Sequence, residues 1–550
     1  MKHNRALLLF FLPLVIACSS KEGGNNDDAL KSFDQSRFES YIKVLASDEF
    51  QGRMPFTEGE EKTVAYLEKE FKALGLEPGN GDSYFQNVPM VEITPTADSI
   101  MQVKSSKGKT LRLRGFDDFI ISSRHTEAEI DWKNVPLVFA GFGIVAPEYN
   151  WNDYENLDVK NKIVVVLVND PGFGSGDSTF FKGNTMTYYG RWTYKFEEAA
   201  RQGAKGCLVI HDTAPAGYPF QVLQSNWNSA HLYLDTRGHE TYQPDGVGWI
   251  TKAAIGKVFA LAGLDFSKAE AAAHQRGYKA QALDAGVSLR MKLKVRYDNS
   301  RNVVAKLTGS KRPDEYIIYT AHWDHLGIGP KDASGDSIYN GAIDNASGTA
   351  GLLELAAVFK SLDPKPERSI LFLAVTGEEQ GLLGSEYYAA HPIYPKEKTV
   401  AEINMDVVNP YGKMKDVMVI GSGQSELEDY LAKTASSMGR YLRPDSEPEK
   451  GFYFRSDHFN FAKVGIPALY IESGTDFVGK GTAYGQKLKD EYTEKYYHQP
   501  SDEYDTTRLN FEGGIDDLKL LFEVGKKLAF EDTWPKWKEG SEFKAVRERN

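Results

Sequence analysis

The stretch 316–406 constrains the fold most, because three apolar runs in it each lead to histidine or carboxylate side chains. The runs and the polar residues after them are 316–321 with His322, 370–375 with Glu378 and Glu379, and 400–404 with Asp406. Short β-branched runs of this kind are typical of buried strands in an open α/β sheet. Because the crevice of such sheets lies outside the carboxyl ends of the strands, we expect these side chains to gather at one edge.

Such a gathering of one histidine and four carboxylates would be strongly repulsive without cations. The fourth carboxylate is Asp344, in the turn-rich run 340–348 that opens a helix. Cations would neutralise the cluster. A catalytic zinc takes three protein ligands and keeps one position open, and two metals bridged by one carboxylate need five ligands. The residues that supply this number are His322, Asp344, Glu379, Asp406 and His498.

Two carboxylates remain beside this ligand set. Glu378 is adjacent to a ligand but is not needed as one, so a free carboxylate there suits a general base. Asp324 follows His322 by two residues and is placed to accept the imidazole N–H, as ligating histidines require. We therefore expect Glu378 to move protons and Asp324 to orient His322.

The first 35 residues are typical of an export and anchoring segment. Lys2 and Arg5 precede the apolar run 6–17, which is too short to span a bilayer as a mature helix. Val15-Ile16-Ala17-Cys18 resembles a bacterial lipobox with Cys18 as the lipidated residue. We expect a signal peptide at 1–17, a flexible tether at 18–35 and an exported lipoprotein of the bacterial envelope, facing the periplasm or the cell surface.

The remaining chain predicts a discontinuous domain with an insert. We expect an α/β domain, with a mixed, mostly parallel sheet flanked by helices, from 36–130 and 294–534, and a C-terminal tail at 535–550. The segment 131–293 carries its own strands and resembles the β-rich α/β protease-associated domain. The formal net charge of −12 argues against nucleic acid as a partner.

The motifs around these residues are similar to those of the co-catalytic zinc aminopeptidase family, which includes bacterial secreted aminopeptidases and glutamate carboxypeptidases. The matching pieces are 321–327, 341–348, 376–385, 403–406, 455–458 and 497–498. The resemblance implies two zinc ions, with Asp344 as bridging ligand, His322 and Asp406 on one ion, and Glu379 and His498 on the other. It also implies Glu378 as base and Asp324 as support.

Two further residues are candidates for the substrate side of the site. Tyr497 resembles a tyrosine that some family members use to hydrogen-bond the developing oxyanion, and Arg455 is a candidate substrate contact. We expect a di-zinc peptidase that acts on peptides, and an aminopeptidase is the prediction that we favour. A carboxypeptidase, a dipeptidase and a non-catalytic, receptor-like ectodomain remain alternatives.

The sequence lacks the motifs of two other hydrolase classes, the serine hydrolases and the nucleotide hydrolases. No Gly-x-Ser-x-Gly elbow of a serine hydrolase occurs in the sequence. The run 474–480 mimics a phosphate-binding loop, but Gly481 stands where that loop needs a serine or threonine.

Overall fold

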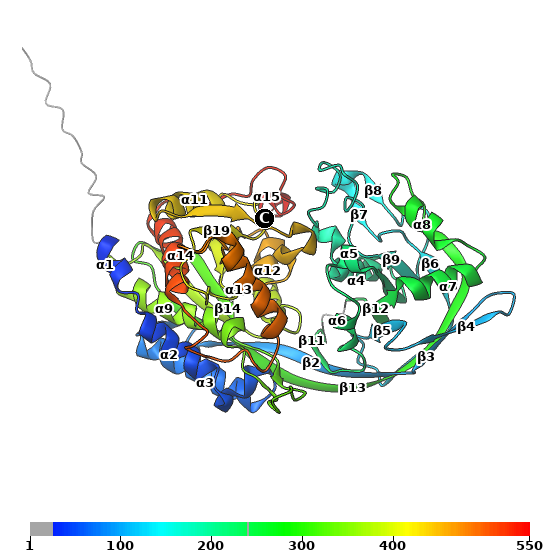
Figure 1. The fold of residues 1–550 in the computed structure, drawn as a ribbon, viewed down its shortest axis with the longest axis horizontal. Coiled ribbons are helices and arrows are strands. Elements are labelled where there is room, and N and C mark those ends of the chain that lie inside the picture. Colours follow the sequence, from blue (N-terminus) through cyan, green and yellow to red (C-terminus); the bar gives the residue numbers. More distant parts are fainter. Residues whose placement is uncertain (1–25, 239–240, 550) are drawn as a thin grey trace, which may run out of the picture.

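The computed structural model describes residues 26–238 and 241–549, so the signal peptide and Cys18 lie outside the described residues. The described chain folds into two units that lie side by side (Figure 1). Two long antiparallel strands, β2 (Phe85–Ala97) and β13 (Gln281–Leu307), pass from one unit to the other.

The first unit is built on a mixed sheet with the strand order β1–β13–β17–β14–β18–β21–β19–β20. Its other strands are β1 (Glu77–Pro78), β14 (Arg312–His322), β17 (Arg368–Val375), β18 (Thr399–Asn404), β19 (Asp416–Val419), β20 (Tyr441–Pro444) and β21 (Ala468–Ser473). The four central strands, β17, β14, β18 and β21, are parallel, whereas β13 and β19 join antiparallel. The expected mixed, mostly parallel sheet is confirmed.

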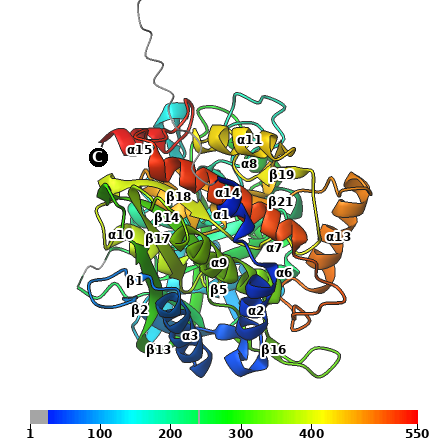
Figure 2. The same ribbon diagram turned by 90° about the vertical axis from the view of Figure 1, so that its left-hand side faces the viewer.

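Helices cover both faces of this sheet. The first face carries α2 (Gln35–Leu45), α3 (Glu58–Ala73), α9 (Gly348–Lys360) and α14 (Glu512–Phe530), and the second carries α10 (Leu383–Ala390) and α12 (His458–Lys463). In Figure 2, α9 and α14 lie side by side in front of the strands. The start of α3 follows from its sequence, because Thr57 accepts the Gly59 N–H at 3.2 Å and Glu60 accepts the Phe56 N–H at 2.7 Å.

The second unit has its own sheet and its own core. Its parallel strands are β6 (Glu129–Phe139), β9 (Ile163–Leu167), β10 (Gly206–His211) and β12 (Gly246–Thr251). Antiparallel neighbours are β3 (Ile100–Lys104), β4 (Thr110–Arg114) and β5 (Phe119–Ser122), and β11 (His231–Leu234) pairs with β2. The helices are α4 (Trp192–Arg201), α5 (Thr213–Ala216), α6 (Gln221–Gln224), α7 (Lys252–Leu261) and α8 (Phe266–Ala273).

The core of the second unit begins earlier than the boundary at residue 131 that the sequence texture indicates. It already includes Val91, Met101 and Phe119, because β2 reaches into this unit before the chain enters β3. The unit therefore takes up much of the segment 36–130 that we assigned to the first domain.

Both ends of the described chain differ from the expected loose segments. The helix α1 (Asn26–Lys31) lies within the expected flexible tether, and its Ala29 is buried in the core of the first unit. Near the other end, Trp537 is buried and its indole N–H donates to the Gly465 carbonyl at 2.9 Å, before α15 (Lys544–Arg549). Apolar contacts order both segments. The polar composition of these segments did not predict this ordering.

Two helical glycines test how tightly the helices pack. A methyl group at Gly525 in α14 would lie 1.9 Å from the Tyr319 hydroxyl oxygen, whereas a methyl group at Gly256 in α7 would have no neighbour within 4 Å. We expect Gly525→Ala to lower the free energy of unfolding by about 1–3 kcal/mol through overpacking. Gly256→Ala should raise it by about 0.5–1 kcal/mol through helix propensity. Urea denaturation of both variants measures this, and equal effects would contradict the packing described here.

Candidate metal centre

The predicted ligands meet because the strands that carry them are parallel neighbours. His322 ends β14 and pairs in register with Val375 at the end of β17, so the loop with Glu378 and Glu379 starts beside it. Asp406 follows the end of β18, the other neighbour of β14. All three strands end at one edge of the sheet, as expected from the sequence.

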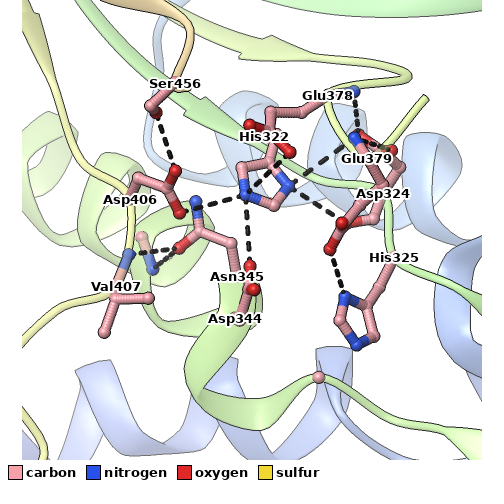
Figure 3. Close-up of polar contacts among 12 residues, drawn as sticks. His322, Asp324, His325, Asp344, Asn345, Glu378, Glu379, Asp406, Val407 and Ser456 are labelled. Atoms are coloured by element: carbon pink, nitrogen blue, oxygen red, sulfur yellow. Dashed lines mark hydrogen bonds and ion pairs between the residues drawn. The ribbon is translucent and has the colours of Figure 1, made fainter. Parts of the chain in front are cut away.

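Asp344 lies between two groups of donor atoms. Figure 3 shows it beside His322 and Asp406. One oxygen, Oδ1, lies 3.3 Å from His322 Nε2, and that nitrogen is 3.1 Å from Asp406 Oδ1. The other oxygen, Oδ2, lies 3.2 Å from His498 Nε2, which is also 3.2 Å from Glu379 Oε2. The structure thus brings all five predicted ligands together, with one carboxylate shared between the two groups.

The donor set fits two divalent cations. Ligand-type atoms of His322, Asp344 and Asp406 lie within 4.8 Å of one another, and so do those of His325, Asp344 and Glu379. The His322 and Asp344 side chains are only 1% and 7% exposed. Imidazole and carboxylate donors of this kind bind zinc and related divalent ions, and a shared carboxylate is typical of two-metal sites.

The two adjacent glutamates have opposite electrostatic environments. Burial, and then the charges of Asp406 and Glu379, raise the pKa of Glu378 well above its usual range despite His322. Burial also acts to raise the pKa of Glu379, but His498 and His325 outweigh it and lower that pKa to about 2. Carboxyl groups whose pKa values are pushed apart in this way are suited to different tasks.

Asp324 supports the site differently from our expectation. Its carboxylate accepts the backbone N–H groups of Glu378 at 3.1 Å and of Glu379 at 3.3 Å. The Nδ1 atom of His322 lies 3.2 Å from the backbone carbonyl of Asp324 and 3.9 Å from its carboxylate. The side chain of Asp324 therefore holds the glutamate loop, and its carbonyl is the nearer partner of the imidazole.

His325 lies beside the Glu379 carboxylate and is drawn below it in Figure 3. Its Nδ1 atom is 2.7 Å from Glu379 Oε1, while the oxygen Oε2 of the same carboxylate faces His498. This contact orients the ligand Glu379.

Three further supporting residues escaped the sequence analysis. The Ser456 hydroxyl donates to Asp406 Oδ2 at 2.7 Å, and the Asp502 carboxylate accepts the Asp344 N–H at 3.2 Å. Arg53 is 1% exposed and donates to the carbonyls of Trp323, Leu45, Asn340 and Gly341 at 2.6–2.9 Å. The sequence could have pointed to two of them, because Ser456 lies within a motif that matches the family and Asp502 follows His498 by four residues. Arg53 had none.

Tyr497 is exposed beside the ligand His498, and Arg455 is half-buried. The Tyr497 ring is 44% exposed and stacks on the His498 ring, with centroids 3.9 Å apart. The Arg455 Nη2 atom donates to the Lys450 carbonyl at 2.6 Å, and its guanidinium lies 5.1 Å from the Phe452 ring. Neither side chain contacts a predicted ligand through a charged group, so both remain available to a bound molecule.

The contact between Ser456 and Asp406 can be tested through metal affinity. Ser456→Ala removes the hydroxyl that orients Asp406 and leaves the Asn404 amide, which donates to it at 2.7 Å, without this acceptor. We expect metal affinity to fall by about 10- to 100-fold, the usual effect of removing a partner that orients a ligand. Competition with a chromogenic chelator measures this, with Ser437→Ala on the exposed end of α11 (Leu427–Ser437) as control. Unchanged affinity would contradict the role of Ser456.

Comparison with known proteins agrees with this geometry. Residues 302–520 match Peptidase family M28. A protein named "Probable zinc metalloprotease" from Pyrenophora teres f. teres is 43% identical over 110 residues, which cover 20% of this chain and 23% of that protein. "Aminopeptidase NAALADL1" from Rattus norvegicus is 37% identical over 126 residues, 22% of this chain and 15% of the relative. The chain thus spans less than a quarter of the length of these two relatives.

Among solved structures, "Aminopeptidase from Aneurinibacillus sp. strain AM-1" has a TM-score of 0.49 at 20% identity, covering 93% of this chain and 96% of that one. The matched range, 302–520, contains every one of the five convergent ligand residues. Residues 302–520, which carry the candidate metal centre, are therefore similar to Peptidase family M28.

Proposed function

We propose that the protein is a di-zinc exopeptidase, and most specifically an aminopeptidase that removes N-terminal residues from peptides. One observation carries this proposal: Glu378 is a carboxylate only 10% exposed, left free beside two donor groups that share Asp344. The relatives named as a zinc metalloprotease and an aminopeptidase support the metal and the reaction class. Peptides are accordingly the proposed substrates.

The protein residues have separate tasks in this reaction. Zinc ions held by His322, Asp344, Asp406, Glu379 and His498 would activate a water molecule and polarise the scissile carbonyl. Glu378, whose carboxylate lies 4.0 Å from His322 Nε2, takes the proton from the attacking water and delivers it to the leaving amine. Asp324 keeps Glu378 in place through the backbone N–H. Tyr497, stacked on His498, can donate its hydroxyl to the developing oxyanion.

The alternatives differ in what they cleave. A carboxypeptidase or dipeptidase would use the same centre, whereas a receptor-like ectodomain would bind peptides without cleaving them. The presence of all five ligands, together with a free Glu378, favours catalysis. Incubation with a peptide series bearing free and acetylated N-termini, followed by mass spectrometry, separates the possibilities. Stepwise loss of N-terminal residues from the free series alone supports the aminopeptidase.

Glu378 and Glu379 should respond differently to the same substitution. Glutamine is nearly isosteric with glutamate, but it is a poor metal ligand and cannot take a proton. We expect Glu378→Gln to retain two metal ions per chain and to lose about 10²- to 10⁴-fold in kcat. Glu379→Gln should instead lose the ion that Glu379 shares with His498. Elemental analysis and kcat of both variants decide this, and metal loss from Glu378→Gln with retention in Glu379→Gln would reverse the two roles.

We also propose that the chain is an exported lipoprotein, with Cys18 lipidated and the signal peptide 1–17 removed. The basic residues and the lipobox-like run before Cys18 support this. In the described part of the chain, none of the helices combines the length and apolar character needed to cross a bilayer. We further propose that the second unit is a protease-associated domain, which its β-rich α/β architecture supports.

Membrane attachment through Cys18 gives a direct test. In a bacterial host, a clickable fatty-acid analogue should label the wild-type protein, which should sediment with membranes. Cys18→Ser should abolish labelling and release the protein into the soluble fraction, while Cys207→Ser, at a buried thiol, should keep both properties. Labelling that survives Cys18→Ser would rule out this anchor.

A further inference from the structure

The two units contact each other directly beside the metal centre. Loops of the second unit meet the loop 446–457 of the first, which leads into α12 (Figure 1). The Met186 N–H donates to the Pro448 carbonyl at 3.1 Å, and the Tyr188 ring packs on Phe459 with centroids 5.0 Å apart. A molecule bound at the metal centre therefore has a wall made by the second unit.

Two arginines, Arg191 and Arg455, one from each unit, lie near enough at this contact to interact electrostatically, and neither is held in an ion pair. Arg191 is 9% exposed, and its Nε atom is buried with no hydrogen-bond partner. The Nε atom of Arg455 is likewise buried and has no hydrogen-bond partner. Among the residues that the structure describes, neither guanidinium group forms an ion pair within 4.0 Å, and Asp445 acts on Arg455 only from a longer distance. Buried arginines are ordinarily paired.

The surroundings make these charges costly. Burial, followed by the charge of Arg455, lowers the pKa of Arg191 to about 9. The Tyr218 side chain interacts electrostatically with both guanidinium groups, and its ring lies 6.0 Å from that of Arg455. Arg191 is also the N-cap of α4, a helix that no side chain caps. The positive end of this helix adds to the local positive potential. An anion bound here would remove the repulsion and use the free donors.

The arginine pair adjoins the reacting centre. Arg455 directly precedes Ser456, whose hydroxyl holds Asp406. Arg455 also interacts electrostatically with Tyr497, which stacks on His498. An anion between the arginines would therefore belong to a molecule that reaches the metal ligands.

We propose that Arg191 and Arg455 form a carboxylate-binding site for the peptide substrate. Guanidinium groups bind carboxylates through paired N–H donors, and these arginines retain such donors in a partly dry contact. The carboxylate is the C-terminal group of a short peptide or the side chain of an aspartate or glutamate. This inference rests on the proposed peptidase function and narrows it to short or acidic peptides.

Three peptides separate the two sources of the carboxylate. These are Ala-Ala-Ala, its C-terminal amide, and the amide of Ala-Glu-Ala. If the terminal carboxylate binds, the free acid should exceed its amide by roughly 10- to 100-fold in kcat/KM, the value of a charge-assisted hydrogen bond. If an acidic side chain binds, the glutamate peptide should exceed the alanine amide by a similar factor. Equal kcat/KM for all three peptides would overturn the proposal.

Variants connect the preference to the arginines. Arg191→Gln and Arg455→Gln should each remove the preference for the carboxylate, so that the ratio of kcat/KM between the carboxylate peptide and the uncharged amide falls to about one. Arg276→Gln, an exposed arginine elsewhere in the second unit, serves as the matched control and should keep it. Because Arg191 is buried without a counter-ion, its replacement should not lower the melting temperature. Equal losses on acid and amide would overturn the proposal.

A binding measurement distinguishes failure of this site from failure of the peptidase function. Calorimetry of Ala-Ala-Ala and the two amides on the Glu378→Gln protein requires no turnover. Tighter binding of a carboxylate peptide, lost again in the Arg455→Gln double variant, supports the site even if the wild-type protein cleaves nothing. Cleavage without any carboxylate preference in rate or binding retains the peptidase and rejects the arginine site.

Discussion

The structure depends on the concentration of negative charge at one edge of a parallel sheet. Asp344 lies within 3.3 Å of both His322 and His498, and Asp406 and Glu379 complete the two groups. Like charges at this depth repel one another strongly, so the arrangement is stable only with cations between them. The two glutamates differ in the balance of these charges. His498 and His325 outweigh burial and Asp344 at Glu379, whereas His322 does not outweigh burial and the neighbouring carboxylates at Glu378.

A surrounding layer of backbone hydrogen bonds holds these side chains against that repulsion. Asp324 and Asp502 are buried carboxylates that accept N–H groups from the loops of Glu379 and Asp344. Arg53 donates in turn to carbonyls on the chain segments beside His322 and Asp344. Each loop is thus fixed by a charged side chain acting on the peptide backbone, and charge-assisted bonds of this type are stronger than neutral ones. The positions of the ligands follow from this framework and not from the strands alone.

The second unit has a place in this arrangement that extends beyond packing. Its loops lie against the segment that contains Ser456, and they bring Arg191 opposite Arg455. Our proposal assigns these arginines to the carboxylate of a peptide, so the metals would bind the scissile carbonyl and the arginines a carboxylate of the same substrate. This division would make recognition depend on how the two units are held together by β2 and β13.

The sequence by itself determined the strands that carry the ligands. The β-branched runs before His322 and Asp406 predict these strands without knowledge of any tertiary contact. It also determined the cap of α3, which depends on Thr57 and Glu60 alone. Only the tertiary structure decided which partners these residues meet. Arg53 lies far from Gly341 along the chain, and the Asp324 carboxylate turns to the glutamate loop instead of His322. The second core starts near Val91, and Arg191 meets Arg455, because distant segments pack together. Such contacts leave no periodicity or spacing in a sequence, since they depend on how strands and loops are brought together in space.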